Sequence, residues 1–501
     1  MSEIEIKFVT RERPLAPFIS SVLPAIEKAG YQISREPEVR LQNDYYDTPE
    51  HHFQNEKMGF RVRGCNGVFE QTMKTHGKVS GGLHQRAEYN IDLVSAEPDL
   101  TLFDKNVWPS GWHVEQVNRQ LERQFSTHFV RTAFNITLDS DSIEVVVDEG
   151  EATTGKNSAP IREVELELKA GSVASLFTLA KIIARHTPVR LSDVSKAAQG
   201  YQLLSGISPV VVPLSSFLPL QQQETTEAAF CSAVQHALSH WQKHEHLFYE
   251  TGSVKVLAEI VKCARLLMQT VSLYLPVLQC PQLLAVHQLL MAYMQDWLWQ
   301  DDLQSLRYLL SKKSLFNKCL SKFPALISYL QGRKAGLIHA HDPESLFFSG
   351  QSNELKLALA EIVAAKPWRS HSKAYDVPVM EHAQGWLSQG WQTVQQTLPK
   401  SRNMTPENYI AIEVLLRQTL WNGYLLAGLF DEERHHFRAP WLDILTGIDE
   451  MKALLMLRAM ANESELDDIG EVLTWVEEKL ASLMRVMERT RQAGMQGDIY
   501  W

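Results

Sequence analysis

Several features that define other protein classes are missing from this sequence of 501 residues. It has only 5 cysteines and no Cys-x-x-Cys pair, which excludes a disulfide framework and a thiolate zinc site. It has no complete Gly-x-x-x-x-Gly-Lys-Ser/Thr loop of the kind that cradles phosphates. Its net charge of -10 excludes a broadly basic surface for nucleic acid. We therefore expect free thiols and no nucleic-acid partner.

Long apolar runs are missing as well. The first residues alternate charged side chains with isoleucine, so no signal peptide is predicted, and no run of about 18 apolar residues predicts a membrane span. These absences predict a cytoplasmic protein with no membrane partner.

The composition is that of a folded protein, with 45% hydrophobic and 22% charged residues. A chain of this length exceeds the ~150 to 250 residues at which one core usually stops growing, so at least two domains are expected. Residues 1–206 are predicted as the first domain, 207–224 as a linker containing Pro209, Pro213 and Pro219, and 225–501 as the second.

The first domain has the period-2 pattern of β-strands, interrupted by two predicted helices, Leu15 to Gly30 and Val173 to His186. Cys65-Asn66-Gly67-Val68 predicts a hairpin turn. Strands are predicted where apolar and polar residues alternate: Glu3 to Phe8, Phe60 to Gly64, Phe69 to Lys74, Gln85 to Ile91, Ile143 to Asp148 and Ile161 to Leu168.

The second domain repeats apolar residues at helix spacing, for example Val254, Leu257, Val261, Ala264 and Met268. Its breaker residues are typical of a bundle with short loops. The predicted fold class is therefore α+β: an antiparallel β-barrel followed by an all-α helical bundle.

Charged side chains share one face on several predicted strands. Glu3, Glu5 and Lys7 alternate with apolar residues, as do Glu163 and Glu165. One interpretation is a solvated outer face of an amphipathic sheet. The other places these faces inside a wide barrel, where carboxylates are compensated by a divalent cation and basic side chains by a polyanion. Because the clustered ligands are carboxylates, the cation should be magnesium or manganese.

Ordered motifs favour the second interpretation. Glu3-x-Glu5-x-Lys7 is similar to the Glu-x-Glu-x-Lys mark of the CYTH superfamily of triphosphate tunnel enzymes. Other segments resemble the family in the same order: Asn43 to Pro49, Gly59 to Arg63, Met73-Lys74, Gly82 to Arg86, Arg131, Asp148, Glu163 to Glu165, and Ser195 to Tyr201. The arrangement is especially like the bacterial inorganic triphosphatases that carry a C-terminal CHAD domain.

The resemblance implies a tunnel in which tripolyphosphate is hydrolysed to pyrophosphate and phosphate with Mg²⁺ or Mn²⁺, by electrostatic stabilisation and without a side-chain nucleophile. Asp148 is implied either as a metal ligand or as the orienter of a basic residue. Metal ligands are otherwise implied at Glu3, Glu5, Glu163 and Glu165. Phosphates are implied to contact Lys7, Arg61, Arg63, Lys74, Arg86, Arg131 and Lys196. The residues expected to act on the reacting phosphate are Glu5, Lys7, Arg61 and Arg63.

The helical half resembles a CHAD domain, with His236, His240 and His244 at four-residue spacing on one helix face. A core-edge row of histidines is the simpler interpretation, and a helical metal site is the alternative. Polyphosphate is a possible partner of this half. Its basic run comprises Lys312, Lys313, Lys318, Lys322, Arg333 and Lys334.

Two alternatives to an inorganic triphosphatase stay open. The same tunnel could hydrolyse thiamine triphosphate or another organic triphosphate. It could also be a polyphosphate-binding module without catalysis, although pure anion binding does not require two clusters of glutamates.

Overall fold

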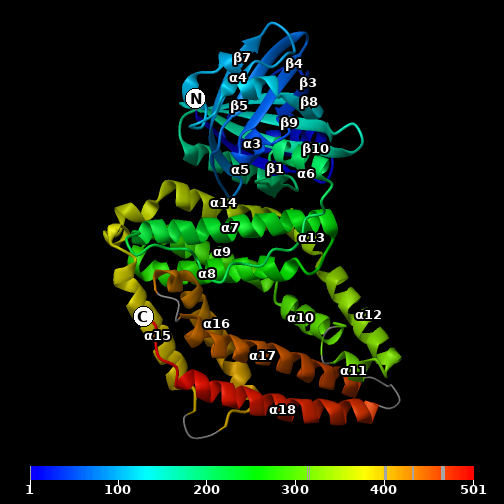
Figure 1. The fold of residues 1–501 in the computed structure, drawn as a ribbon, viewed down its shortest axis with the longest axis vertical. Coiled ribbons are helices and arrows are strands. Elements are labelled where there is room, and N and C mark those ends of the chain that lie inside the picture. Colours follow the sequence, from blue (N-terminus) through cyan, green and yellow to red (C-terminus); the bar gives the residue numbers. More distant parts are fainter. Residues whose placement is uncertain (1, 313, 315, 400–402, 431–433, 464–468) are drawn as a thin grey trace. The chain divides into compact units, whose positions relative to one another are not determined.

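The structure is a computed structural model that describes residues 2–312, 314, 316–399, 403–430, 434–463 and 469–501 (Figure 1). The chain forms two compact units. Unit 1 comprises Met1–Val211, Gln242–Gly252 and Glu344–Ala365, and unit 2 comprises Val212–Trp241, Ser253–Pro343 and Lys366–Trp501. Unit 1 therefore includes two stretches from the part of the chain predicted to be the helical bundle.

The strands of unit 1 form one antiparallel sheet that closes into a barrel. The order is β1-β10-β9-β8-β3-β4-β5-β7, and a second pairing of β1 with β7 closes the ring. The α+β class is thus confirmed. The strands are β1 Ser2–Val9, β2 Gln32–Arg35, β3 Val39–Asp47, β4 Gly59–Cys65, β5 Val68–Lys74, β6 Lys78–Ser80, β7 Leu83–Leu93, β8 Glu122–Leu138, β9 Asp141–Thr153, β10 Ser158–Ala170 and β11 Arg190–Leu191.

Each strand that the alternation predicts is present, and so is the predicted hairpin. Asn66 and Gly67 have φ of 49° and 84°, as a tight turn that follows the strand twist requires, and Cys65 pairs with Val68. The alternation did not identify β3 and β8. Both are rich in polar residues on each face, so their two faces differ too little to mark a strand.

Helices cover the apolar outside of the barrel. The predicted helix Val173–His186 is α5, whereas Leu15 to Gly30 contains a π-helical turn, Phe18–Val22, between α1 and α2. Ile6, Phe8, Val164 and Leu166 are fully buried, on the barrel strands that α5 contacts. The helices at residues 1–211 are α1 Leu15–Pro17, α2 Leu23–Lys28, α3 His52–Asn55, α4 Val114–Arg119, α5 Val173–His186 and α6 Lys196–Ser205.

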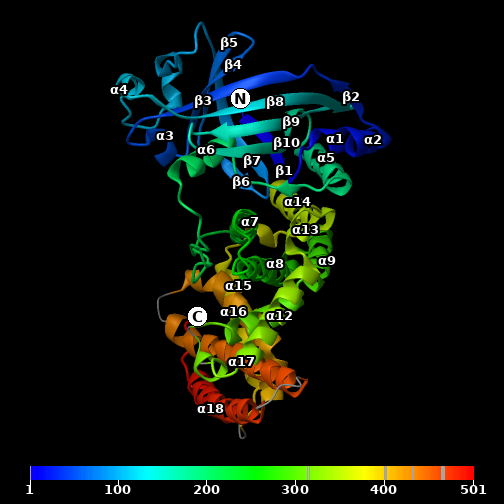
Figure 2. The same cartoon turned by 90° about the vertical axis from the view of Figure 1, so that its right-hand side faces the viewer.

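Helix α14 (Gly350–Ala365) belongs to unit 1 and lies against α5, as both Figure 1 and Figure 2 show. Arg185 of α5 donates two hydrogen bonds to Glu354 of α14, at 2.8 and 2.7 Å. A Cβ atom on Gly350 would lie 3.1 Å from the carbonyl oxygen of Ala184. Glycine at the start of α14 therefore allows the two helices to approach closely.

Unit 2 is all helical, with one large core built around α16, α17 and α18. The helix α8 is long and apolar enough to span a membrane by length and composition, with mean hydropathy 1.2, and 56% of that window is buried inside the fold. A core helix passes the same test. The remaining helices are α7 Thr226–Thr251, α8 Leu257–Leu278, α9 Pro281–Gln295, α10 Trp299–Leu309, α11 Asn317–Leu320, α12 Pro324–His341, α13 Pro343–Phe347, α15 Met380–Thr397, α16 Pro406–Leu426, α17 Arg434–Glu463 and α18 Ile469–Met495.

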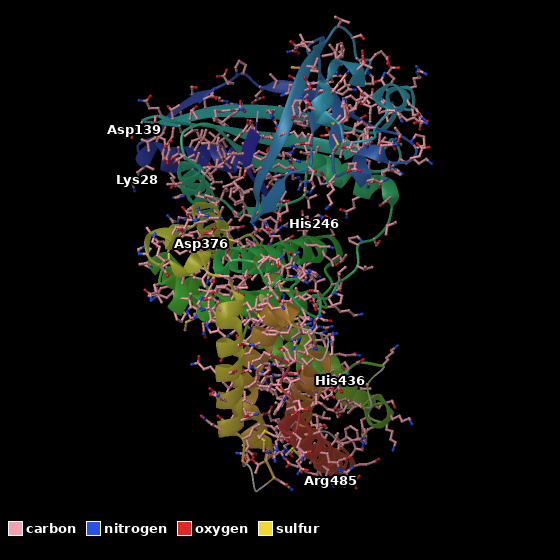
Figure 3. The ribbon with its side chains drawn as sticks, turned by 60° about the vertical axis from the view of Figure 1, so that its left-hand side comes forward. Lys28, Asp139, His246, Asp376, His436 and Arg485 are labelled. Carbon is pink, nitrogen blue, oxygen red and sulfur yellow. The ribbon has the colours of Figure 1, made fainter. Side chains whose placement is uncertain are left out.

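One histidine makes the stability of unit 1 depend on pH. His246, labelled in Figure 3 near the end of α7, is largely buried and its Nε2 has no hydrogen-bond partner among the described residues. Burial and the nearby Arg190 lower the pKa of His246 from 6.5 to about 4. Below pH 6.5 the unfolded chain takes up a proton that the folded chain does not. The free energy of unfolding therefore decreases as the pH is lowered from 6.5 toward 4.

We expect the wild type to lose on the order of 2 kcal/mol more stability than His246→Gln between about pH 7.5 and pH 5. Urea unfolding at the two pH values measures this difference. His186→Gln is the control, because His186 is exposed at the end of α5 and should behave like the wild type. Equal pH dependence in wild type and His246→Gln would contradict the assignment.

Candidate functional site

The interior of the barrel is a polar cavity of about 550 Å³. Basic and acidic side chains from strands on every side of the ring line it together. The charged lining residues are Glu3, Glu5, Lys7, Arg61, Arg63, Glu70, Lys74, Arg86, Glu88, Arg131, Glu144, Glu165, Glu167, Lys169 and Lys196. The charged faces therefore point inward, and the solvated outer face considered from the sequence is wrong for these residues.

Strand pairing sets opposite charges beside each other. Lys7 on β1 lies opposite Glu165 on β10, and Glu3 lies opposite Arg86 on β7. Because alternate residues of a strand face the same side, one correct register directs the whole charged set into the barrel. The apolar partners of the alternation face outward toward the covering helices.

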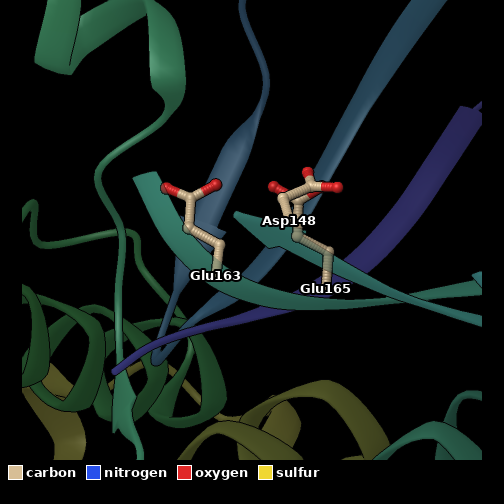
Figure 4. Close-up of side chains that lie close together, drawn as sticks. All are labelled: Asp148, Glu163 and Glu165. Atoms are coloured by element: carbon tan, nitrogen blue, oxygen red, sulfur yellow. The ribbon is translucent and has the colours of Figure 1, made fainter. Parts of the chain in front are cut away.

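Asp148, Glu163 and Glu165 form the one group of three possible metal ligands found among the described residues. Their carboxylate oxygens lie within 4.8 Å of one another. Figure 4 shows the three carboxylates on the same side of β9 and β10. Asp148 and Glu163 are buried, and Glu165 borders the cavity.

Lys196 joins the three carboxylates. Its Nζ lies 2.8 Å from Asp148, 2.5 Å from Glu163 and 2.8 Å from Glu165. Burial lowers the pKa of Lys196, but the three carboxylates outweigh burial and raise it well above the ordinary value.

The start of α6 directs Lys196 inward. Ser195 caps the helix by accepting a hydrogen bond from the backbone N–H of Ala198, so Lys196 is the first helical residue. A cation is unfavourable at a helix N-terminus, and the carboxylates compensate for it. Gly200 lets α6 rest on β8, because a Cβ there would lie 2.0 Å from the ring of Phe125.

Two further cations bind the same carboxylates. Arg131 donates two hydrogen bonds to Asp148, at 2.8 and 2.7 Å, and one to Glu165 at 3.2 Å. The Nζ of Lys7 lies 2.6 Å from Glu163 and 3.6 Å from Glu165. Asp148 thus contacts Arg131 and Lys196 directly, as an orienter of basic residues would.

A second charge cluster lies on β1, β5 and β7. Lys74 bridges Glu3 at 2.8 Å and Glu88 at 2.9 Å, and Arg86 lies 2.9 Å from Glu5. Burial, with Glu5 and Glu88 nearby, raises the pKa of Glu3 to about 7 despite Lys74. For Glu88, Lys74 and Arg61 outweigh burial and lower the pKa to about 2.

Arg61 and Arg63 on β4 differ in their partners. Arg61 lies 3.9 Å from Glu88. Arg63 donates to the side-chain oxygen of Asn43 at 2.8 Å and forms no ion pair within the described part of the chain. Burial, Arg61 and Arg131 together lower the pKa of Arg63 to about 9. Arg63 is therefore a cation that the protein itself does not neutralise, as an anion-binding residue would be.

Most of the residues singled out from the sequence meet at this cavity, but not as one cluster. Glu3 and Glu5 are not members of the group formed by Asp148, Glu163 and Glu165. Two polar neighbours of the site are not among the residues proposed from the sequence. Asn43 accepts a hydrogen bond from Arg63, and His84, two residues before Arg86 on β7, is buried.

The histidine row of α7 does not converge on a common point. The Nε2 atom of His236 lies 3.0 Å from the hydroxyl of Tyr424, and that of His240 lies 3.3 Å from Glu259. His244 is fully buried. No group of three possible metal ligands in the described ranges includes these histidines.

The chain is similar to several known proteins. A family model described as "CYTH domain" matches residues 1–201. The chain is 33% identical over 246 residues to an "Inorganic triphosphatase" of Haemophilus influenzae, covering 48% of this chain and 67% of that protein. The solved CHAD domain of the plant Ricinus communis is 13% identical with a TM-score of 0.43, covering 58% of this chain and 99% of that one.

Proposed function

Because this chain belongs to the CYTH family, we propose that it is an inorganic triphosphatase that hydrolyses tripolyphosphate to pyrophosphate and phosphate. The observation that supports this proposal is the mixed lining of the barrel. Seven basic side chains, named next, line one cavity together with Lys169, and carboxylates from both clusters border it. They are Lys7, Arg61, Arg63, Lys74, Arg86, Arg131 and Lys196.

The carboxylates fit a hard divalent cation. All the candidate ligands are carboxylate oxygens, which suit Mg²⁺ or Mn²⁺ better than softer metals. Asp148, Glu163 and Glu165 would hold one such ion, and Glu3 and Glu5 are proposed as further ligands. A bound divalent cation would withdraw charge from the phosphate oxygens and so make the phosphorus easier to attack.

The basic side chains would bind and orient the phosphates. Arg61 and Arg63 present planar guanidinium groups that can donate hydrogen bonds in pairs to phosphate oxygens, whereas Lys7 acts as a point charge. Fixed cations around the phosphates also stabilise the charge that shifts toward the leaving oxygen during phosphoryl transfer. Walls of a barrel keep these groups in place without reorganisation.

Phosphate release from tripolyphosphate by the purified full chain tests this function. Activity should require added Mg²⁺ or Mn²⁺, disappear with a chelator, and fall roughly 10²-fold or more in Glu5→Ala and Arg61→Ala. Rates on thiamine triphosphate and ATP, measured in parallel, decide between inorganic and organic substrates. Full activity in both variants would contradict the proposal, and tight tripolyphosphate binding without turnover would favour a binding module.

For the helical half we propose polyphosphate as a ligand of the basic run. Within this run, Lys322 pairs with Glu471 at 3.1 Å with both side chains more than half exposed, and Lys313 lies outside the described residues. A cytoplasmic location is also proposed, and it is supported by the five cysteines, which are all free.

A further inference from the structure

The short strand β11 lies at the edge of the barrel sheet, beside β1, and is held there by a side chain from α14. The backbone N–H of Leu191 donates to Oδ1 of Asn353 at 2.9 Å, and Nδ2 of Asn353 donates to the carbonyl of Val189 at 2.6 Å. Asn353 is fully buried. One carboxamide thus satisfies a donor and an acceptor that a neighbouring strand would otherwise satisfy.

The residues that follow β11 hold the strands of the site. The N–H of Ser192 donates to the carbonyl of Lys7 at 3.0 Å, and Nε2 of His84 lies 3.2 Å from the carbonyl of Ser192. Oδ1 of Asp193 accepts from the N–H of Gly82 at 2.9 Å, and Gly82 in turn accepts from the N–H of Lys7. Both backbone groups of Lys7 therefore depend on this segment. Its carbonyl accepts from Ser192, and its N–H donates to Gly82, which is hydrogen-bonded to Asp193.

A buried ion pair strengthens the position of α14. Lys356, one turn after Asn353, lies 2.6 Å from Glu245 of α7, and neither side chain is exposed. Breaking such a pair leaves a buried charge without its partner, so the contact specifies one arrangement of α14 against residues 242–252. This arrangement keeps Asn353 directed at β11.

We propose that Asn353 is a positioning residue of the barrel site, which acts through residues 189–193 on the backbone of Lys7 and so on the placement of its ammonium group. It reaches across 162 positions of sequence to do so. The kinetic consequence rests on the proposed triphosphatase function. A displacement of a reacting group by about 1 Å can reduce a rate 10²-fold, so a modest shift of β1 would be measurable.

Kinetics of full-length variants test the proposal. Asn353→Leu keeps the branched shape of the side chain and removes the hydrogen bonds to Leu191 and Val189, together with those to Phe347 and Ser349. We expect kcat on tripolyphosphate at least tenfold lower. In a Lys7→Ala background the same substitution should change kcat less than about twofold, because both changes act on one group. A purely structural role would instead lower kcat equally in both backgrounds, which would overturn the proposal. Glu354→Gln, the neighbouring residue on α14, is the matched control with kcat near the wild-type value.

Hydrogen exchange separates this proposal from the proposed function. In Asn353→Leu, peptides covering residues 189–193 and β1 should exchange faster, and the rest of the barrel should not. If the wild type hydrolyses no triphosphate, this local change still supports the link from α14 to β1, and unchanged exchange overturns it. If Asn353→Leu does not fold, Asn353→Ala removes the same hydrogen bonds without a larger apolar side chain.

Discussion

Replacement of Lys196 with methionine should nearly abolish triphosphate hydrolysis and lower the stability of unit 1 by about 3 to 5 kcal/mol. Lys196 is 7% exposed and is the cation shared by Asp148, Glu163 and Glu165. Methionine preserves most of the volume but leaves three clustered carboxylates with less compensation. Their repulsion disfavours the folded barrel, and a proposed phosphate-binding cation is lost at the same time.

Urea unfolding and initial rates on tripolyphosphate measure both effects. Lys169→Met is the matched control, because Lys169 pairs with Glu167 at 2.7 Å and Glu144 at 3.1 Å but is 43% exposed. Exposed pairs contribute little, so less than about 1 kcal/mol should be lost. Equal losses of stability in the two variants would mean that burial of the Lys196 cluster does not increase its contribution to stability. Full activity in Lys196→Met would show that hydrolysis does not require Lys196.

Replacement of Arg63 with alanine should lower activity, as replacement of Lys196 does, but should leave stability unchanged. We expect kcat/KM on tripolyphosphate to fall roughly 10²-fold, since charge-assisted hydrogen bonds to phosphate contribute about 1.5 to 3 kcal/mol each. Burial, Arg61 and Arg131 lower the pKa of Arg63 to about 9, which makes the charged form less favourable in the fold than in water. Its removal should therefore leave the unfolding midpoint at or above that of the wild type.

Thermal unfolding with and without tripolyphosphate distinguishes the two contributions. The wild type should be stabilised by the ligand, and Arg63→Ala should lose most of that increase. Arg123→Ala is the control: Arg123 is 60% exposed and lies 3.7 Å from Asp44, so both readouts should match the wild type. A lower unfolding midpoint for Arg63→Ala with unchanged kinetics would mean that Arg63 stabilises the fold and does not bind substrate.

Together the two variants distinguish a basic residue that stabilises the barrel, Lys196, from one that is proposed to bind an anion, Arg63. Lys196 and Arg131 pair with carboxylates, whereas Arg63 donates a hydrogen bond to the neutral Asn43 and forms no ion pair among the described residues. On β4 and β5, Arg63 lies opposite Glu70, but the carboxylate does not come within ion-pair distance.

The sequence alone determined the strands with clear alternation, the class of fold and the residue types of the site. Alternation works for β1 and β10 because one face of each is apolar and covered by helices, while the other is charged. It fails for β8, whose seventeen residues carry polar side chains on both faces. The sequence also could not divide the acidic residues into two clusters, since spacing along a strand says nothing about which strand lies beside it.

Only the tertiary structure determined which acidic and basic side chains pair with one another. Asp148 pairs with Arg131 because β8 pairs with β9 in one register, and Lys196 reaches the carboxylates because α6 packs on β8 through Gly200. It also decided that Asn353, from a part of the chain predicted to belong to the helical half, supports β11 in unit 1. Local patterns specify which face of an element is polar. Contacts between elements that are distant in sequence depend on the fold of the whole chain, and no local pattern determines that fold.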